Sequence, residues 1–261
     1  MITAINNSRV KKVVQLNQKA KARKEENVFV VEGCKMFLEA PAERIRDIFV
    51  TESFYYKNEA CRSKLENCKY EFVSEEILAK MSDTKTPQGI LCVVVQHTFD
   101  MQAILEKPDP LFVILEDLQD PGNLGTIIRT GEGAGIDGVF MSRNTVDIYN
   151  PKTIRATMGS IYRVPFWYVE DMKSLFQQLH THGIKTYAAH LKGERYYDQN
   201  AFQQGTAFVI GNEGNGLQKE TADMASAYIK IPMEGQVESL NAAIATSLLM
   251  YEARRQRAQI I

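Results

Sequence analysis

Three segments in the second half of the chain constrain its fold most strongly, because in each of them hydrophobic residues meet a cluster of Gly, Asn, Ser or Glu. They are residues 123–129 (NLGTIIR), 210–217 (IGNEGNGL) and 231–243 (IPMEGQVESLNAA). In α/β proteins the ends of strands present backbone N–H groups and polar side chains to a ligand. The three segments therefore predict one composite pocket.

The order and spelling of these segments resemble the three sequence motifs of the SpoU family of RNA ribose 2′-O-methyltransferases, within the knotted SPOUT superfamily. The resemblance covers roughly residues 111 to 256, and three motifs together are far more specific than any one alone. Thr126 stands where an Ala is usual in the first motif, and Ala242 where a Val is usual in the third. Neither departure removes a functional group.

The resemblance implies a set of site residues and a cofactor, S-adenosylmethionine. Main-chain groups that would hold the adenosine portion of the cofactor belong to Gly211, Ile231 and Leu240. Side chains that match the catalytic centre are those of Asn123, Arg129, Glu213, Ser239 and Asn241. A further stretch frequently seen in the family matches Arg155, Met158 and Gly159, although packing explains these three equally well.

The polar residues of the motifs also have structural explanations. Asn123 is a natural N-cap for a helix over residues 124–134, and Arg129 within that helix could pair with a carboxylate. Glu213 would be favourable near the N-terminus of the next helix, and Ser239 could cap a long helix that opens at residues 238–241 and runs to about residue 256. The motif match favours function for Arg129 and a mixed role for Asn123.

Methyl transfer from a sulfonium is an in-line displacement, so positioning of the acceptor oxygen supplies much of the rate. A ribose hydroxyl is a poor nucleophile until its proton is lost or its charge is stabilised. Because a guanidinium is effectively always protonated, we expect Arg129 to stabilise the developing alkoxide or hold the neighbouring phosphate. Asn123 and Asn241 would orient the ribose and the loops, and Glu213 would fix Arg129 or the Asn side chains.

Helix and strand patterns predict an α/β protein with two domains. Residues 1–96 predict a small α/β RNA-binding domain, which is similar to the substrate-binding domain that often precedes the SpoU catalytic domain through residues 29–33 (FVVEG) and 86–89 (TPQG). Residues 97–110 predict a linker, and residues 111–261 a methyltransferase domain with a mostly parallel sheet and helices on both faces. Only the resemblance implies a C-terminal trefoil knot, since general topology rules argue against one.

Hydrophobic periodicity gives the individual elements. In the first domain it predicts helices over residues 8–23, 33–40, 58–66 and 74–81 and strands over residues 28–32, 48–50, 71–73 and 90–96. In the second domain it predicts strands over residues 111–115, 138–141, 164–167, 185–189, 207–211 and 228–231, with helices between them.

Basic residues are concentrated at the start of the chain, although the formal net charge is only -1. Residues 1–24 contain no Asp or Glu and include Arg9, Lys11, Lys12, Lys19, Lys21, Arg23 and Lys24. Local clusters of this kind can bind RNA phosphates, because counterion release depends on where the charges lie. The alternative is a solvated, lysine-rich helix face.

Cysteine and histidine spacing argues against a metal site. Four cysteines, at positions 34, 61, 68 and 92, form neither paired zinc spacings nor a disulfide scaffold, so we expect reduced thiols. His180 and His182 point to different faces of their predicted helix. The chain also starts without the apolar stretch of a signal peptide and has no run long enough to span a membrane, which predicts a cytoplasmic location.

The resemblance implies an S-adenosylmethionine-dependent 2′-O-methyltransferase that acts on RNA ribose as a homodimer, and we expect it in the cytoplasm. The additional N-terminal domain favours ribosomal RNA of the 23S type, and transfer RNA is the nearest alternative. A different class of function is a non-catalytic RNA-binding or ribosome-assembly factor with the same fold. The intact catalytic side chains argue against that alternative.

Overall fold

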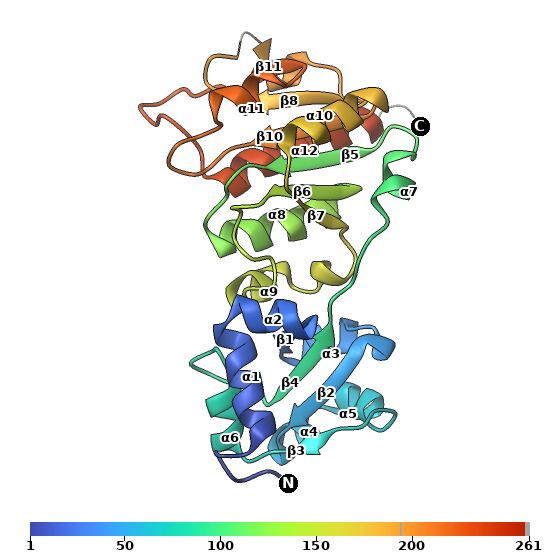
Figure 1. Cartoon of the computed structure of the whole chain (residues 1–261), viewed down its shortest axis with the longest axis vertical. Coiled ribbons are helices and arrows are strands. Elements are labelled where there is room, and N and C mark those ends of the chain that lie inside the picture. Colours follow the sequence, from blue (N-terminus) through green and yellow to red (C-terminus); the bar gives the residue numbers. More distant parts are fainter. Residues whose placement is uncertain (194, 259–261) are drawn as a thin grey trace. The chain divides into compact units, whose positions relative to one another are not determined.

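The computed structural model describes residues 1–193 and 195–258 and divides into two compact units (Figure 1). The first unit comprises Met1–Thr98 and Asp147–Tyr162, and the second comprises Phe99–Val146 and the chain from Arg163 onward. Residues 147–162, which the sequence assigned to the second domain, therefore pack with the first 98 residues. The last three residues of that predicted domain lie outside the described residues. The predicted domain boundaries stay a prediction, because compactness does not establish independent folding.

A four-stranded sheet in the order β1-β4-β2-β3 forms the centre of the first unit. Both β1 and β2 pair antiparallel with β4, whereas β2 and β3 are parallel. The strands are β1 (Val28–Glu32), β2 (Ile45–Val50), β3 (Glu71–Phe72) and β4 (Ile90–Val95). The helices are α1 (Ser8–Gln18), α2 (Ala20–Glu26), α3 (Cys34–Glu39), η1 (Ala42–Arg44), α4 (Glu52–Lys57), α5 (Glu59–Leu65), α6 (Glu75–Met81), α9 (Pro151–Thr157) and η2 (Ser160–Tyr162).

The single helix predicted over residues 8–23 is wrong, because the helix breaks at Lys19, whose backbone is extended (φ -124°, ψ 112°). The last carbonyls of a helix have no partner within the helix. Here the Arg23 guanidinium donates to the carbonyl oxygens of Leu16 and Asn17 at 2.6 and 3.2 Å. The break thus lets Arg23 fold back and satisfy the end of α1.

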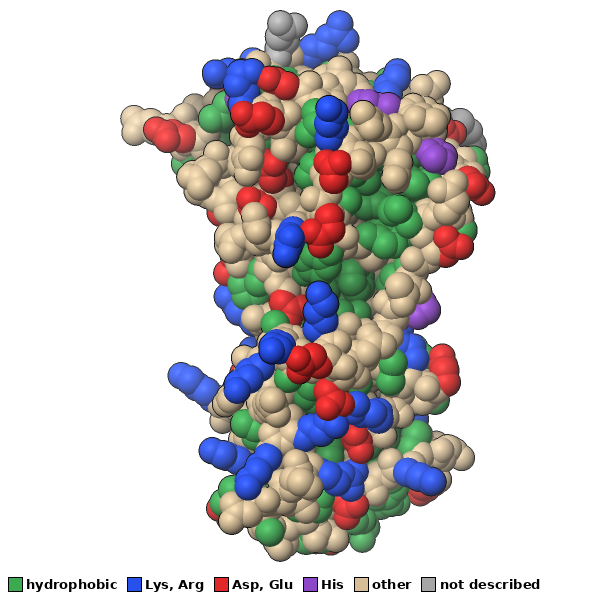
Figure 2. All heavy atoms as spheres, in the orientation of Figure 1, with side chains coloured by type: hydrophobic (Ala, Val, Ile, Leu, Met, Phe, Trp, Pro, Cys, Tyr) green, Lys and Arg blue, Asp and Glu red, His purple; other side chains and the backbone are tan. Residues whose placement is uncertain are grey.

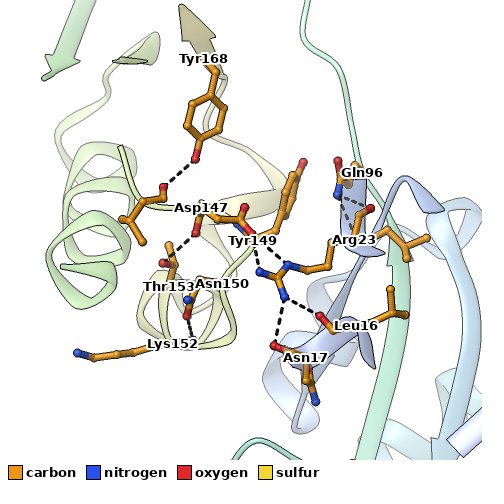
Figure 3. A network of polar contacts seen from close by, with 12 residues as sticks. Leu16, Asn17, Arg23, Gln96, Asp147, Tyr149, Asn150, Lys152, Thr153 and Tyr168 are labelled. Carbon is orange, nitrogen blue, oxygen red and sulfur yellow. Dashed lines mark hydrogen bonds and ion pairs between the residues drawn. The ribbon is translucent and has the colours of Figure 1, made fainter. Parts of the chain in front are cut away.

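Arg23 also anchors the returning segment 147–162 (Figure 3). It is only 4% exposed, and its Nε donates to the carboxylate of Asp147 at 3.1 Å. Nearby, the ring of Tyr149 stacks on that of Phe29 with centroids 4.8 Å apart, and burial raises the pKa of Tyr149 to about 12. The segment is therefore held to the first unit both by an ion pair between the buried Arg23 and the partly exposed Asp147 and by aromatic packing.

The expectation of four reduced cysteines is wrong for Cys34 and Cys61, which form a disulfide, while Cys68 and Cys92 are free. Helices α3 and α5 pack against each other, which brings the two Cα atoms to 6.3 Å. That separation lies within the usual range for a bridged pair. The proximity arises from tertiary packing and leaves no sign in the spacing of the cysteines.

The second unit contains a seven-stranded sheet in the order β7-β6-β5-β10-β8-β11-β9, and every neighbouring pair is parallel (Figure 1). Its strands are β5 (Leu111–Leu115), β6 (Gly138–Ser142), β7 (Phe166–Val169), β8 (Lys185–Ala189), β9 (Arg195–Tyr196), β10 (Thr206–Ile210) and β11 (Ala227–Lys230). Its helices are α7 (Met101–Leu105), α8 (Pro121–Ala134), α10 (Met172–Thr181), η3 (Tyr197–Gln199), α11 (Lys219–Asp223) and α12 (Ala242–Ala258).

Helices cover both faces of this sheet, as predicted. On one face, residues of α7, α10 and α11 join strand residues such as Ala207 and Val209 in one hydrophobic core. Phe208 alternates with them and points to the opposite face, where α12 contacts both β10 and α8. The α/β fold with a flanked parallel sheet is therefore confirmed, and the knot stays a prediction.

The linker predicted over residues 97–110 is partly wrong. It contains α7, whose first turn is capped by Asp100 accepting a hydrogen bond from the Ala103 N–H at 3.2 Å. Leu105 is 3% exposed and belongs to the core of the second unit. A helix of five residues is too short to show a periodic pattern, which is why the sequence suggested only a linker.

Candidate active site

A cavity of about 510 Å³ lies at the carboxyl ends of β8, β10 and β11. These three strands are parallel neighbours, so their carboxyl ends meet at one edge of the sheet. Segments that follow each strand line the cavity, together with the chain that enters α12. The lining includes six of the predicted site residues: Gly211, Glu213, Ile231, Ser239, Leu240 and Asn241.

Gly211 allows two stretches of backbone to pass very close to each other beside the cavity. A Cβ atom added to Gly211 would lie 2.2 Å from the carbonyl carbon of Gly216 and from the nitrogen of Leu217. Real Cβ atoms do not approach backbone so closely, and only glycine fits here. One wall of the cavity is therefore built from main chain.

Asn212, which the sequence analysis did not single out, holds this loop in shape. Its side-chain oxygen accepts hydrogen bonds from the N–H groups of Gly214 and Asn215 at 2.8 and 3.1 Å. Its side-chain nitrogen donates to the carbonyl oxygen of Asp117 at 2.8 Å, which ties the loop to the end of β5. An Asn followed by glycines is a turn signal that could have identified it.

The helix that carries the first motif begins earlier than predicted. Asp120 is its N-cap and accepts from the backbone N–H of Asn123 at 2.8 Å, so the prediction that Asn123 caps the helix is wrong. The reason is Pro121, which is well suited to the first helical position because it needs no N–H partner there. The side chain of Asn123 is consequently available for other contacts.

Asn241 lies just before α12, and its side chain reaches the first motif. Its side-chain oxygen accepts from the N–H groups of Ala243 and Ile244 at 2.9 and 3.3 Å, so Asn241 caps the helix and the alternative of Ser239 as cap is wrong. Its side-chain nitrogen donates to the side-chain oxygen of Asn123 at 2.9 Å. The exposed Ser239 instead lines the cavity.

Glu213 completes a chain of hydrogen bonds through all three motifs. Its carboxylate accepts from the side-chain nitrogen of Asn123 at 3.0 Å and from the N–H groups of Gln119 and Asp120 at 3.1 and 3.0 Å. Partial burial alone would raise the pKa of Glu213, but these donors together outweigh it and lower the pKa from its ordinary value. Glu213 was predicted to hold either Arg129 or the Asn side chains, and in the structure it holds the side chain of Asn123.

Arg129 lies apart from this network. It is exposed on α8, whereas its neighbours Ile127 and Ile128 are fully buried. The residues that line the cavity do not include it, and it forms no ion pair within residues 1–193 and 195–258. The structural alternative required an ion pair between Arg129 and a carboxylate. In the described chain no carboxylate neutralises its guanidinium in this way.

His190 is a further cavity residue that the sequence analysis did not single out. Its Nδ1 accepts from the Lys192 N–H at 3.0 Å, which places a ring proton on Nε2. Its ring lies 5.2 Å from that of Tyr228. A lone histidine beyond a strand end carries no local sequence signal of a pocket.

Residues 110–251 match the model of the SpoU rRNA Methylase family. The chain belongs to this family. Residues 7–92 also match the MRM3-like substrate binding domain. The SpoU match includes every predicted site residue, and the second match covers the sheet of the first unit up to Cys92.

Relatives of the SpoU family resemble the chain over nearly its whole length. An uncharacterised tRNA/rRNA methyltransferase of Synechocystis sp. is 34% identical, covering 98% of this chain and 94% of the relative. The 23S rRNA (guanosine(2553)-2′-O)-methyltransferase RlmP of Bacillus subtilis is 30% identical, with 97% and 98% covered. The AdoMet-bound rRNA methyltransferase of Sinorhizobium meliloti is 30% identical and superimposes with a TM-score of 0.85, covering 97% of each chain.

Residues 1–24 of this SpoU protein, which we call the basic arm, have four of their seven Lys and Arg side chains paired with carboxylates. Ion pairs join Arg9 to Asp47 and Glu71, Lys12 to Glu26, Lys21 to Glu25 and Arg23 to Asp147. In the part of the chain that the structure describes, exposed cations of the arm without such a pair are Lys11, Lys19 and Lys24. On the face shown in Figure 2, Lys and Arg side chains are likewise interspersed with Asp and Glu. The arm is therefore a weaker electrostatic footprint than its sequence suggests.

The part of the SpoU chain that the structure describes has neither a metal-binding cluster nor a membrane-spanning helix. Within the described ranges, no group of three or more His, Cys, Asp or Glu side chains could hold a metal ion. None of the described helices is both long and apolar enough to cross a membrane.

Proposed function

We propose that this protein transfers a methyl group from S-adenosylmethionine to a ribose 2′-hydroxyl of ribosomal RNA of the 23S type, in the cytoplasm. The observation that carries the proposal is the hydrogen-bonded chain Glu213–Asn123–Asn241 at the edge of the cavity. It joins all three motifs in one arrangement, which is what a reaction dependent on positioning requires. RlmP supports the choice of reaction and of RNA.

The cavity fits the cofactor in size and in character. About 510 Å³ is within the ordinary range for small-molecule sites, and the close approach at Gly211 provides a wall of main chain. We assign Gly211, Ile231 and Leu240 to hold the adenosine portion, since all three line the cavity. Bound S-adenosylmethionine supplies an electrophilic methyl group.

The side chains of this chain have separate tasks in the proposed reaction. Asn123 and Asn241 orient the ribose through amide groups whose positions are fixed by their mutual hydrogen bond. Glu213 holds Asn123, and Ser239 contributes a hydroxyl to the cavity wall. Arg129 stabilises negative charge on the acceptor oxygen or on the neighbouring phosphate, because its guanidinium cannot serve as a base at neutral pH.

The same proposal includes a homodimer built on α12. Ile244, Leu248 and Tyr251 occupy positions i, i+4 and i+7 of this helix, so they share one face. They are 52%, 38% and 50% exposed, although such residues are usually buried. A second copy of the chain would cover this stripe in a two-fold interface, which is the commonest oligomer geometry.

The experiment that tests the reaction uses the full chain, labelled S-adenosylmethionine and unmodified ribosomal or transfer RNA. A methyl group on the 2′-oxygen blocks alkaline cleavage, because that oxygen can no longer attack the adjacent phosphate. We expect label from ribosomal RNA in an alkali-resistant dinucleotide, and a DNA copy, which lacks the hydroxyl, should take up none. Label found only in transfer RNA would mean that the substrate is transfer RNA and not ribosomal RNA. Label on a base would overturn ribose methylation, and cofactor binding without transfer to either RNA would favour a non-catalytic factor.

A further inference from the structure

Four aromatic side chains form a cluster in the first unit, away from the motifs described above. Tyr55 and Tyr56 belong to α4, Phe72 belongs to β3, and Tyr70 comes just before that strand. The ring of Tyr55 stacks on that of Tyr70 at 5.8 Å and meets the edges of Tyr56 and Phe72 at 5.4 and 5.5 Å. Tyr70 and Phe72 are also in edge contact at 5.3 Å. We call these four residues the aromatic cluster.

The aromatic cluster is only partly used for packing. Val73, the residue after Phe72, is buried in the core beneath α1 and α6, so Phe72 points to the other face of the sheet. Strand β3 is the last strand of the sheet, and Ile2 bridges its outer side, donating from its N–H to the carbonyl oxygen of Phe72 at 2.7 Å. Tyr55, Tyr70 and Phe72 are half-buried, whereas Tyr56 is 71% exposed. Tyr55, itself held by Tyr70 and Phe72, therefore meets a fourth ring, Tyr56, that offers its surface to solvent.

The charges around the aromatic cluster are balanced. Lys57 and Lys69 adjoin it in sequence and Arg62 lies on α5, and within the described residues none of the three forms an ion pair. The same helices and the turn after them also carry Glu52, Glu59 and Glu66. A ligand that depended on phosphate contacts alone would gain little here, whereas a ligand with flat apolar faces could use the rings.

We propose that the aromatic cluster is a stacking site for unpaired nucleobases of the RNA substrate, with Tyr56 as the open ring. This inference rests on the proposed function, which makes RNA the substrate. Proteins bind single-stranded RNA by stacking bases on aromatic side chains, and duplex RNA does not offer its base faces in this way. Lys57, Arg62 and Lys69 would accompany the backbone of the bound strand.

The test uses the full chain and short single-stranded RNA in which one base is replaced by fluorescent 2-aminopurine. Tyr56→Ala should weaken binding about fivefold to a hundredfold, because stacking is worth about 1–3 kcal/mol per base. It should also reduce the quenching of 2-aminopurine at saturating protein. Tyr56→Phe keeps the ring and should bind and quench as the original does. Since Tyr56 is 71% exposed, neither change should disturb the fold.

Two further measurements separate stacking from charge. Tyr56→Ala should leave the salt dependence of binding unchanged, whereas Lys57→Ala should reduce the log–log slope by about 0.7 if it contacts one phosphate of a single strand. A duplex of the same sequence should bind both Tyr56 variants equally. Unchanged single-strand affinity and quenching in Tyr56→Ala would overturn the stacking site. Because binding is measured without methyl transfer, failure of the proposed reaction would be seen separately, in the labelling experiment.

Discussion

Asn241 donates a hydrogen bond from its side-chain amide to the side-chain oxygen of Asn123, 118 positions earlier in the chain. The side-chain oxygen of Asn241 caps α12, and the side-chain nitrogen of Asn123 donates in turn to the carboxylate of Glu213. The three motifs are therefore one mechanical unit, in which a change at any member alters the position of the others.

This coupling predicts the outcome of a double-mutant cycle. Asn123→Ala and Asn241→Ala should each lower kcat/KM, and the double variant should be little worse than the poorer single variant, since both remove the same contact. Residues in direct contact typically show interaction energies of about 0.5–3 kcal/mol. Steady-state methylation assays of the three variants measure this interaction energy. If the kcat/KM losses of the two single variants simply multiplied in the double variant, the shared role would be contradicted.

Arg129→Ala should lower the rate of methyl transfer by about 10²–10³, the usual effect of losing an electrostatic stabiliser. The affinity for S-adenosylmethionine should be nearly unchanged, because Arg129 is outside the lining of the cavity. Single-turnover rates and calorimetric titration give the two quantities. Arg254→Ala is a suitable control, since that side chain is also exposed and lies near the end of α12 away from Asn241. Near-normal turnover of Arg129→Ala would remove it from the mechanism.

Gly211→Ala should weaken cofactor binding about fivefold to a hundredfold. The new Cβ would meet backbone at 2.2 Å, so the loop must move, and overpacking of this kind typically costs about 1–3 kcal/mol. Gly235→Ala, in the segment before α12, is the matched control because nothing lies within 4 Å of its Cβ position. Calorimetric titration with S-adenosylmethionine should separate the two variants, and equal affinities would argue against a tight wall at Gly211.

Glu213 predicts a pH dependence of stability with a definite sign. Its pKa in the folded protein is below the ordinary value of 4.5, so the ionised form stabilises the fold above about pH 4.5. That contribution is lost as the pH falls through the lower folded pKa. Urea unfolding between about pH 7 and about pH 3 should show the original chain more stable than Glu213→Gln at neutral pH, with the difference shrinking in acid. A constant difference would mean that ionisation of Glu213 is unimportant.

Leu248→Asp should dissociate the proposed homodimer, because it places a charge in the middle of the apolar stripe on α12. Leu38→Asp is a close control, since Leu38 is 39% exposed and Leu248 is 38% exposed, but Leu38 lies in the first unit. Sedimentation of the full chain at micromolar concentration should give a dimer for the original and the control. A monomer in all three samples would remove the dimer from the proposal.

The parts of the fold that could be predicted are those with strong local patterns. Strands Leu111–Leu115 and Lys185–Ala189 have the predicted bounds, because buried parallel strands are short apolar runs between turn residues. Strand β9, of two exposed residues, has no such pattern and was missed. The start of α8 was misplaced because both Asp120 and Asn123 are good caps, and only the geometry of Pro121 decides between them.

Contacts between distant residues account for most of what the sequence could not show. Arg23 was counted among the surface cations of the basic arm, but it is buried against Asp147, which lies 124 positions away. The motif residues were identifiable as a group, yet the order in which Glu213, Asn123 and Asn241 connect required their positions in space. The positions of Asn212 and His190 in the cavity lining likewise depend on the three-dimensional structure and could not be read from the sequence.

The assignment of residues 147–162 to the first unit means that the chain passes between the two units three times, after Thr98, after Val146 and after Tyr162. Cleavage of any single peptide bond therefore cannot separate the chain into two fragments that each hold one complete unit and nothing of the other. The same interleaving of the two units along the chain also restricts how such proteins can exchange domains during evolution. A gene fusion that replaced only the first 98 residues would leave Asp147 and Tyr149 facing a surface without Arg23 and Phe29. New substrate-binding modules must consequently be acquired together with a compatible α9 segment from the other half of the gene.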